Sequence, residues 1–199
     1  MRTELRAARE TDLAQVVPLL YESAGAMYDR YAGGRRYALR VLERGFARPG
    51  TNASAEVVTV ASLDGRVAAA MAAFPVDELP ARARSFLRLT LRSIPPWRIP
   101  GCLRLYWSGL RAPPAPPGSS LYVDAIATEP ALRRRGAASA LLDEAERKAR
   151  ELGLPAVALD TALDNHAARA LYLERGFEEV AYRPAGRGLP GFVALVREL

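Results

Sequence analysis

One stretch of this sequence combines positive charge, a glycine and the start of a helix. Residues 121–152 are typical of a strand, a tight turn at Arg133 to Gly136, and then a long amphipathic helix. Unpaired backbone N–H groups and the positive end of the helix dipole meet at such a turn. These are the elements of a phosphate site, so the stretch predicts a phosphorylated ligand.

Two polar residues lie at helical spacing further along the chain. Asn165 and Tyr172 lie in a predicted helix that ends at Gly176-Phe177. Their separation of seven residues is two helical turns. Both side chains are therefore expected on one face of the helix, about 10.5 Å apart along its axis.

The strand that leads into the basic turn carries one acidic residue. By the alternation of side chains along a strand, Asp124 shares a face with Tyr122 and Ile126. Its carboxylate either takes part in a site at this strand or forms a salt bridge to one of the many arginines.

The elements that must position these residues indicate a mixed α/β fold without internal repeats. Two predicted strands, Glu56–Leu63 and Arg66–Phe74, flank Asp64-Gly65, the strongest short signal for a β-hairpin. The other predicted elements are a strand at Arg2–Ala8, a helix from Thr11 or Asp12 to Ala24 with a kink or a late start near Pro18, a helix at Tyr37–Phe46, a strand at Pro155–Thr161 and a final strand pair at Glu178–Tyr182 and Gly191–Arg197.

Residues 79–120 differ in composition from the rest of the chain. They contain seven arginines, several prolines and no acidic residue. We interpret about 77–119 as a helical insertion, with helices at Ala81–Ile94 and Gly101–Leu110 and a stiff Pro-rich return. Its aromatic residues are Phe86, Trp97, Tyr106 and Trp107. They suit a substrate lid or a dimer face, but helical spacing favours packing within the insertion.

Composition limits the classes of function. With 199 residues, half of them hydrophobic, the chain can bury a core. The net charge of +6 fits a nucleic acid partner, an acidic substrate or a phosphorylated ligand. Because arginines occur along the whole chain, we expect no nucleic acid partner.

No apolar run approaches the roughly 20 residues of a membrane span, and no signal peptide is seen. A single cysteine fits a reducing cytoplasm. We expect a cytoplasmic protein without a membrane partner; surface attachment through residues 79–120 is an alternative.

Two motifs in this order resemble those of a known family. Arg133-Arg134-Arg135-Gly136-Ala137-Ala138 resembles the Q/R-x-x-G-x-G/A signature of the GCN5-related N-acetyltransferases (GNAT), and it follows a strand and opens a helix. Asn165 to Phe177 resembles the second signature, N-x-x-A-x-x-x-Y-x-x-x-G-F. The resemblance covers about Glu56–Phe74 and Leu121–Leu199 well and the N-terminal helices loosely, and the insertion lies outside it.

This resemblance implies a fold and a donor substrate. The GNAT fold has a central mixed, mostly antiparallel sheet of six to seven strands, splayed between the fourth and fifth and flanked by helices; the insertion would lie between the third and fourth strands. Acetyl-CoA would enter the gap, with its pantetheine on the fourth strand and its pyrophosphate on the N–H groups of the following helix. The implied cofactor-binding residues are Ile126, Ala127, Thr128, Arg133, Arg134, Arg135, Gly136, Ala137, Ala138, Asn165 and Tyr172.

The resemblance also implies catalytic roles. Tyr172 would protonate the departing thiolate, because a phenol keeps its proton at neutral pH and shares it as charge develops. Asp124 would take the proton of the amine, directly or through water, with Glu56 as its rival. The main-chain N–H near Ile126 would polarise the carbonyl.

Other reactive side chains are expected to have no catalytic role. Direct transfer needs no acyl-enzyme, so Cys102 is read as a small buried thiol. His166, the only histidine, is expected to be solvated on the surface. We expect no metal, because there is no second histidine and the acidic residues show no ligand spacing.

These observations predict one N-acetyltransferase domain over residues 1–199, with the insertion at about 77–119. It would transfer an acetyl group from acetyl-CoA directly to a primary amine of a small molecule or protein, in a ternary complex. The alternatives are a non-catalytic acyl-CoA-binding or sensing module and a protein N-acetyltransferase. The sequence does not identify the amine, and a homodimer is left open.

Overall fold

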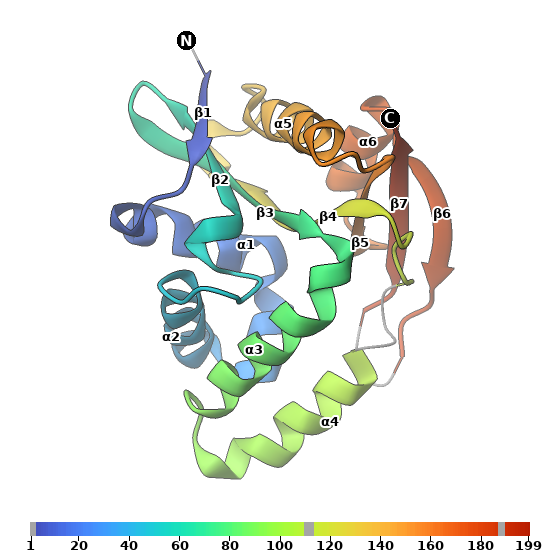
Figure 1. Cartoon of the computed structure of the whole chain (residues 1–199). Helices are drawn as coiled ribbons and strands as arrows, with labels where there is room; N and C mark the ends of the chain where they lie inside the picture. Colours follow the sequence, from blue (N-terminus) through green and yellow to red (C-terminus); the bar gives the residue numbers. More distant parts are fainter. Residues whose placement is uncertain (1–2, 110–113, 187–189) are drawn as a thin grey trace.

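A seven-stranded sheet runs through the molecule (Figure 1). The computed structural model describes residues 3–109, 114–186 and 190–199. The strands are β1 Thr3–Ala7, β2 Val58–Leu63, β3 Arg66–Pro75, β4 Ser120–Thr128, β5 Ala156–Ala162, β6 Glu178–Arg183 and β7 Phe192–Glu198. Their order is β1-β2-β3-β4-β5-β7-β6, with β4 and β5 parallel and the other neighbours antiparallel. The predicted mixed, mostly antiparallel sheet is confirmed.

The sheet splits between β4 and β5. Their parallel register extends only from Ser120 opposite Ala156 to Val123 opposite Leu159. Beyond that point β4 stays paired with β3, and β5 stays paired with β7. Within the described chain, the edge of β4 that faces β5 therefore has no strand partner over residues 124–128. The predicted splay between the fourth and fifth strands is confirmed.

A β-bulge lies on β4 where the split begins. The register with β3 passes from Ala72 opposite Ala125 to Ala73 opposite Val123, so Asp124 is the extra residue. A bulge interrupts the alternation of faces. Ile126 consequently packs in a different core cluster from Tyr122. The expected shared face of Tyr122, Asp124 and Ile126 is wrong for Ile126, because a bulge leaves no trace in the sequence pattern.

Helices cover both faces of the sheet (Figure 1). They are α1 Leu13–Ala32, α2 Arg35–Phe46, α3 Leu79–Leu91, α4 Ile99–Gly109, α5 Ala137–Glu151 and α6 His166–Glu174. The core under α1 and α2 includes Leu20, Phe46 and Phe74, and the core under α5 and α6 includes Leu142 and Phe177. No helix of the described residues is long and apolar enough to span a bilayer.

Two local predictions have different outcomes. Asp64 and Gly65 adopt φ angles of +50° and +81°, as a two-residue hairpin turn requires, and they join β2 to β3 as predicted. The break in α1 lies at Ala24 (φ −152°, ψ 37°) and not near Pro18. Next to the break, the Ser23 hydroxyl donates to the Leu20 carbonyl at 2.7 Å, a bond that commonly bends helices.

The insertion forms α3 and α4 and shares a small core with α1 and α2. Cys102 is buried in that core, and Phe86 packs edge-on against Tyr28 at a ring distance of 6.3 Å. Trp97 and Trp107, in contrast, are 78% and 66% exposed. The expectation that the insertion's aromatic residues pack inside it is wrong for both tryptophans.

Replacement of Leu142 by Ala should test the core beneath α5. The side chain is fully buried, so Leu142→Ala should lower the free energy of unfolding by about 2–5 kcal/mol, measured by chemical denaturation. Leu173→Ala is the matched control on a helix, because Leu173 is 50% exposed and its loss should cost less than about 0.5 kcal/mol. Equal losses in the two variants would contradict this packing.

Candidate active site

The basic turn gives α5 an uncapped N-terminus. Gly136 precedes the helix with φ +82°, in the left-handed region that favours glycine, and as the N-cap residue it has no side chain with which to cap the helix. The first helical bond runs from the Ala140 N–H to the Gly136 carbonyl. The N–H groups of Ala137 and Ala138 therefore lack partners inside the helix, as an anion site requires.

These N–H groups open into a pocket of about 660 Å³ between β4, α5 and α6. Its size is within the range of small-molecule sites. The predicted residues that line it are Ile126, Ala127, Thr128, Arg133, Arg134, Gly136, Ala137, Ala138, Asn165 and Tyr172. Arg135 is exposed and is not among the lining residues, and neither is Asp124.

The three arginines of the turn have different environments. Arg133 forms an ion pair with Glu22 of α1 at 2.9 Å, which ties α1 to the loop before α5. Arg134 lines the pocket and has φ +63°, an uncommon conformation for a residue with a side chain. Among the described residues, Arg134 is therefore the one of the three that lines the pocket and forms no ion pair with an acid.

The start of α6 is fixed by Asn165. Its Oδ1 accepts the Ala168 N–H at 3.3 Å, and its Nδ2 donates to the Thr161 hydroxyl at 3.2 Å. Asn165 thus acts as a helix cap that joins α6 to the end of β5. His166, the next residue, is exposed, as predicted.

Tyr172 lies on the inner face of α6. Its side chain is only 5% exposed, and its ring packs against Phe177 at 5.9 Å between centroids. Burial, and to a smaller extent the charge of Asp160, raises the pKa of the Tyr172 phenol. The phenol is therefore protonated at neutral pH, in the wall of the pocket that Ile126 also lines.

A second polar cluster lies where β4 and β5 separate. Asp124 and Asp160 directly follow the last paired residues of the two strands. The Tyr122 hydroxyl donates to Asp160 Oδ1, and Asn52 Nδ2 donates to Asp124 Oδ2 at 3.0 Å. Burial and then the charge of Asp160 raise the pKa of Asp124 to about 7, against the opposing effect of Asn52. The two carboxylates therefore titrate as a coupled pair.

The phenol of Tyr172 and the carboxylate of Asp124 lie on opposite sides of the split between β4 and β5. Tyr172 belongs to the core under α5 and α6, whereas Asp124 is bonded to the loop that follows α2 and lies near Tyr28 of α1. The bulge at Asp124 brings this about, because it directs the carboxylate away from the face of Ile126.

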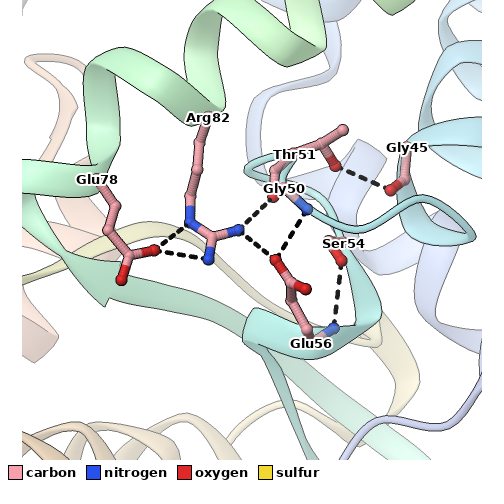
Figure 2. Close-up of polar contacts among 7 residues, drawn as sticks. All are labelled: Gly45, Gly50, Thr51, Ser54, Glu56, Glu78 and Arg82. Atoms are coloured by element: carbon pink, nitrogen blue, oxygen red, sulfur yellow. Dashed lines mark hydrogen bonds and ion pairs between the residues drawn. The ribbon is translucent and has the colours of Figure 1, made fainter.

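Glu56, the rival base, is engaged in a separate network (Figure 2). It accepts from Arg82 at 2.7 Å and from the Gly50 N–H at 2.9 Å, and the guanidinium of Arg82 holds its pKa below the usual value. Arg82 also pairs with Glu78 and donates to the Thr51 carbonyl at 3.0 Å. Glu56 and Arg82 thus fix the loop at 50–56, which carries Asn52.

Sequence reasoning did not select Asp160, Asn52 or Arg82. The sequence did contain a signal for Asp160, since a carboxylate inside the apolar strand 155–161 is unusual. Asn52 had none, because it is one polar residue in a polar loop and meets Asp124 from 72 positions away. Among the described residues, no group of three or more His, Cys, Asp or Glu residues is arranged to hold a metal ion.

Comparisons with known proteins agree with this fold. A family model described as the acetyltransferase (GNAT) family matches residues 23–177. An N-acetyltransferase from Staphylococcus aureus Mu50 has a similar structure, with a TM-score of 0.76, 19% identity, and coverage of 98% of this chain and 100% of that one. A crystal structure described only as an acetyltransferase has a TM-score of 0.72, 20% identity and 98% coverage of both chains. A polyamine N-acetyltransferase of Drosophila melanogaster has a TM-score of 0.59, 16% identity and full coverage of both chains. No protein with curated annotation matches the chain.

The pKa of Asp124 should respond in opposite directions to changes at its two neighbours. Asn52→Ala removes a donor that favours the carboxylate and should raise this pKa above about 7, whereas Asp160→Asn removes a like charge and should lower it. The carboxyl carbon shift of Asp124 in an NMR titration measures both changes. Asn165→Ala is the control, because it removes an amide at α6, and it should leave the pKa of Asp124 unchanged. A pKa of Asp124 near 4 in the wild-type protein would contradict the buried carboxylate pair.

Proposed function

This chain belongs to the GNAT family of acetyltransferases, and on that basis we propose that it transfers an acetyl group from acetyl-CoA directly to a primary amine of a small molecule. The observation that carries the proposal is the split between β4 and β5, with a pocket on one side and a buried acid pair on the other. Residues 1–199 are taken as one such domain, with α3 and α4 as its insertion.

The donor lies in the pocket. The free edge of β4 offers main-chain groups of Ile126 and Thr128 to the amides of pantetheine, as an added strand would use them. The N–H groups of Ala137 and Ala138 receive the pyrophosphate, and Gly136 lets the backbone turn there. Arg134 adds positive charge at the pocket wall.

The acceptor approaches from the side of α1 and α2. A primary amine reaches the site protonated and must lose a proton before it attacks the carbonyl. Asp124 takes that proton, directly or through water, and a pKa of about 7 suits a base at neutral pH. The Asp124–Asp160 pair also attracts a cationic amine, which favours a small cationic acceptor. The main-chain N–H near Ile126 stabilises the charge on the carbonyl oxygen.

The leaving thiolate is protonated from the other side of the split. The Tyr172 phenol holds its proton at neutral pH, as phenols do, and burial raises its pKa further. Tyr172 gives up that proton as charge develops on sulfur. Most of the rate comes from holding the two substrates in contact, since direct transfer needs no covalent intermediate on the protein.

An amine panel tests this proposal against its two alternatives. Incubation with acetyl-CoA, a thiol-detecting reagent and small amines, amino acids or peptides should give thiol release with cationic small amines. Release with peptides alone would identify a protein N-acetyltransferase. If CoA binds but no amine stimulates release, the chain is an acyl-CoA-binding or sensing module.

Tyr172→Phe should lower kcat by about 10²-fold, because the variant keeps the ring but loses the proton donor. The dissociation constant for CoA, from isothermal titration calorimetry, should change less than about twofold. Tyr182→Phe is the matched control, since Tyr182 is 56% exposed on β6. Wild-type turnover in Tyr172→Phe would remove this residue from the mechanism.

The pH profile of kcat/KM should fall on the acid side with a pKa near 7. Below that pH Asp124 is protonated and accepts no proton, and above it the carboxylate is available. Asp160→Asn should move this acid limb to lower pH. The pKa of the free amine substrate is the same for both enzymes, so a shift of the limb reports on the enzyme and not on the amine. Asp124→Asn should lose about 10²-fold in kcat/KM at pH 8. A limb that is identical in wild type and Asp160→Asn would contradict the assignment.

A further inference from the structure

The excess positive charge of this chain lies in one segment. Residues 79–120 hold seven of the 28 basic residues and none of the 22 acidic ones. The rest of the chain has 21 basic and 22 acidic residues and is nearly neutral. Although arginines occur throughout, no other segment of comparable length lacks acidic residues.

Much of this charge is on the surface. The exposed arginine side chains on the helices of this segment are Arg84 and Arg88 of α3 and Arg104 of α4, and Arg92, directly after α3, is exposed as well. Arg82 is the exception, because it is largely buried between Glu56 and Glu78. A cluster of exposed arginines without local acids attracts an anionic partner.

The same segment exposes two large aromatic side chains. Trp97, in a short turn just before α4, is 78% exposed, and Trp107 in α4 is 66% exposed. They are the only tryptophans in the chain. Trp107 packs edge-on against Tyr106 at a ring distance of 5.7 Å, and most of its indole remains open to water. An indole is amphipathic and suits a surface where one end is apolar and the other is wet.

The tryptophans share one outward face. Trp97, Gly101, Arg104 and Trp107 follow one another at three- or four-residue steps, which is the spacing of one helical face, and all four are exposed. The opposite face of α4 carries Cys102, which is buried against α1 and α3. In Figure 1, α4 lies at the lower edge of the molecule.

We propose that this outward face of α4, together with the exposed arginines on and next to α3, docks the protein on the surface of an anionic lipid bilayer. Trp97 and Trp107 enter the headgroup layer, where indoles are favoured, and the exposed arginines contact lipid phosphates. The two indoles are ten residues apart, or about 15 Å along a helix. That distance suits two anchors in one plane, and it is too long for stacking on neighbouring bases of a nucleic acid. The proposal does not depend on the acceptor or on catalysis.

Intrinsic fluorescence tests the docking directly, because both tryptophans lie on the proposed face. Vesicles of phosphatidylcholine with about 30% phosphatidylserine should shift the emission of the full chain to the blue, and brominated lipid should quench it. Phosphatidylcholine vesicles alone should leave the spectrum unchanged. Salt at 0.5 M should largely abolish the shift, since arginine contacts with headgroups are screened.

Vesicle sedimentation separates the two kinds of contact. The double variant Trp97→Ala/Trp107→Ala and the double variant Arg88→Gln/Arg92→Gln should each bind phosphatidylserine vesicles at least about tenfold more weakly. The matched control Arg48→Gln/Arg183→Gln removes the same charge from exposed positions elsewhere and should bind more nearly as wild type. All variants change exposed side chains, and thermal melting should confirm that they fold.

Three results would overturn the proposal. One is the absence of a fluorescence shift with phosphatidylserine vesicles at low salt. Another is tighter binding to single-stranded RNA than to these vesicles, which would assign the face to nucleic acid. The third is a dimer in light scattering that dissociates in Trp97→Ala/Trp107→Ala, which would assign the face to a second copy of this chain.

Discussion

The site depends on the divergence of β4 and β5. Each of the two strands keeps its outer neighbour, β3 or β7, after the pair at Val123 and Leu159, so the sheet opens without losing its other hydrogen bonds. The edge of β4 that faces the opening carries main-chain groups that need partners from solvent or ligand. A strand edge left open inside a sheet is an unusual feature, and it gives the molecule a place where an extended ligand with amides can bind.

The two sides of this opening have different chemistry because of one extra residue. The bulge at Asp124 places Ile126 in the core of α5 and α6, while Tyr122, before the bulge, packs in the core of α1 and α2. The loop at 50–56 completes that side, since Arg82 of the insertion holds the loop in place and Asn52 reaches Asp124 (Figure 2). A buried acid pair is costly to fold, and its presence beside the split favours a function over a structural role.

Much of the architecture could be predicted from local signals. Asp64-Gly65 predicted its hairpin, and Gly136 between a strand and an amphipathic helix predicted an uncapped helix start, because both depend on the conformational freedom of neighbouring residues. The contacts of Asp124 could not be predicted, since they join parts of the chain that meet only in the fold. The exposure of Trp97 and Trp107 could not be predicted either, because helical spacing assigns a residue to a face of the helix but does not show what packs against that face.

A crystal structure of the chain with CoA tests the central role of the split most directly. The pantetheine should lie along the free edge of β4 with hydrogen bonds to main-chain groups of Ile126 and Thr128, and the pyrophosphate should contact the N–H groups of Ala137 and Ala138. CoA bound outside the opening between β4 and β5, or strands that close together over residues 124–128 and 160–162 when CoA binds, would contradict this account.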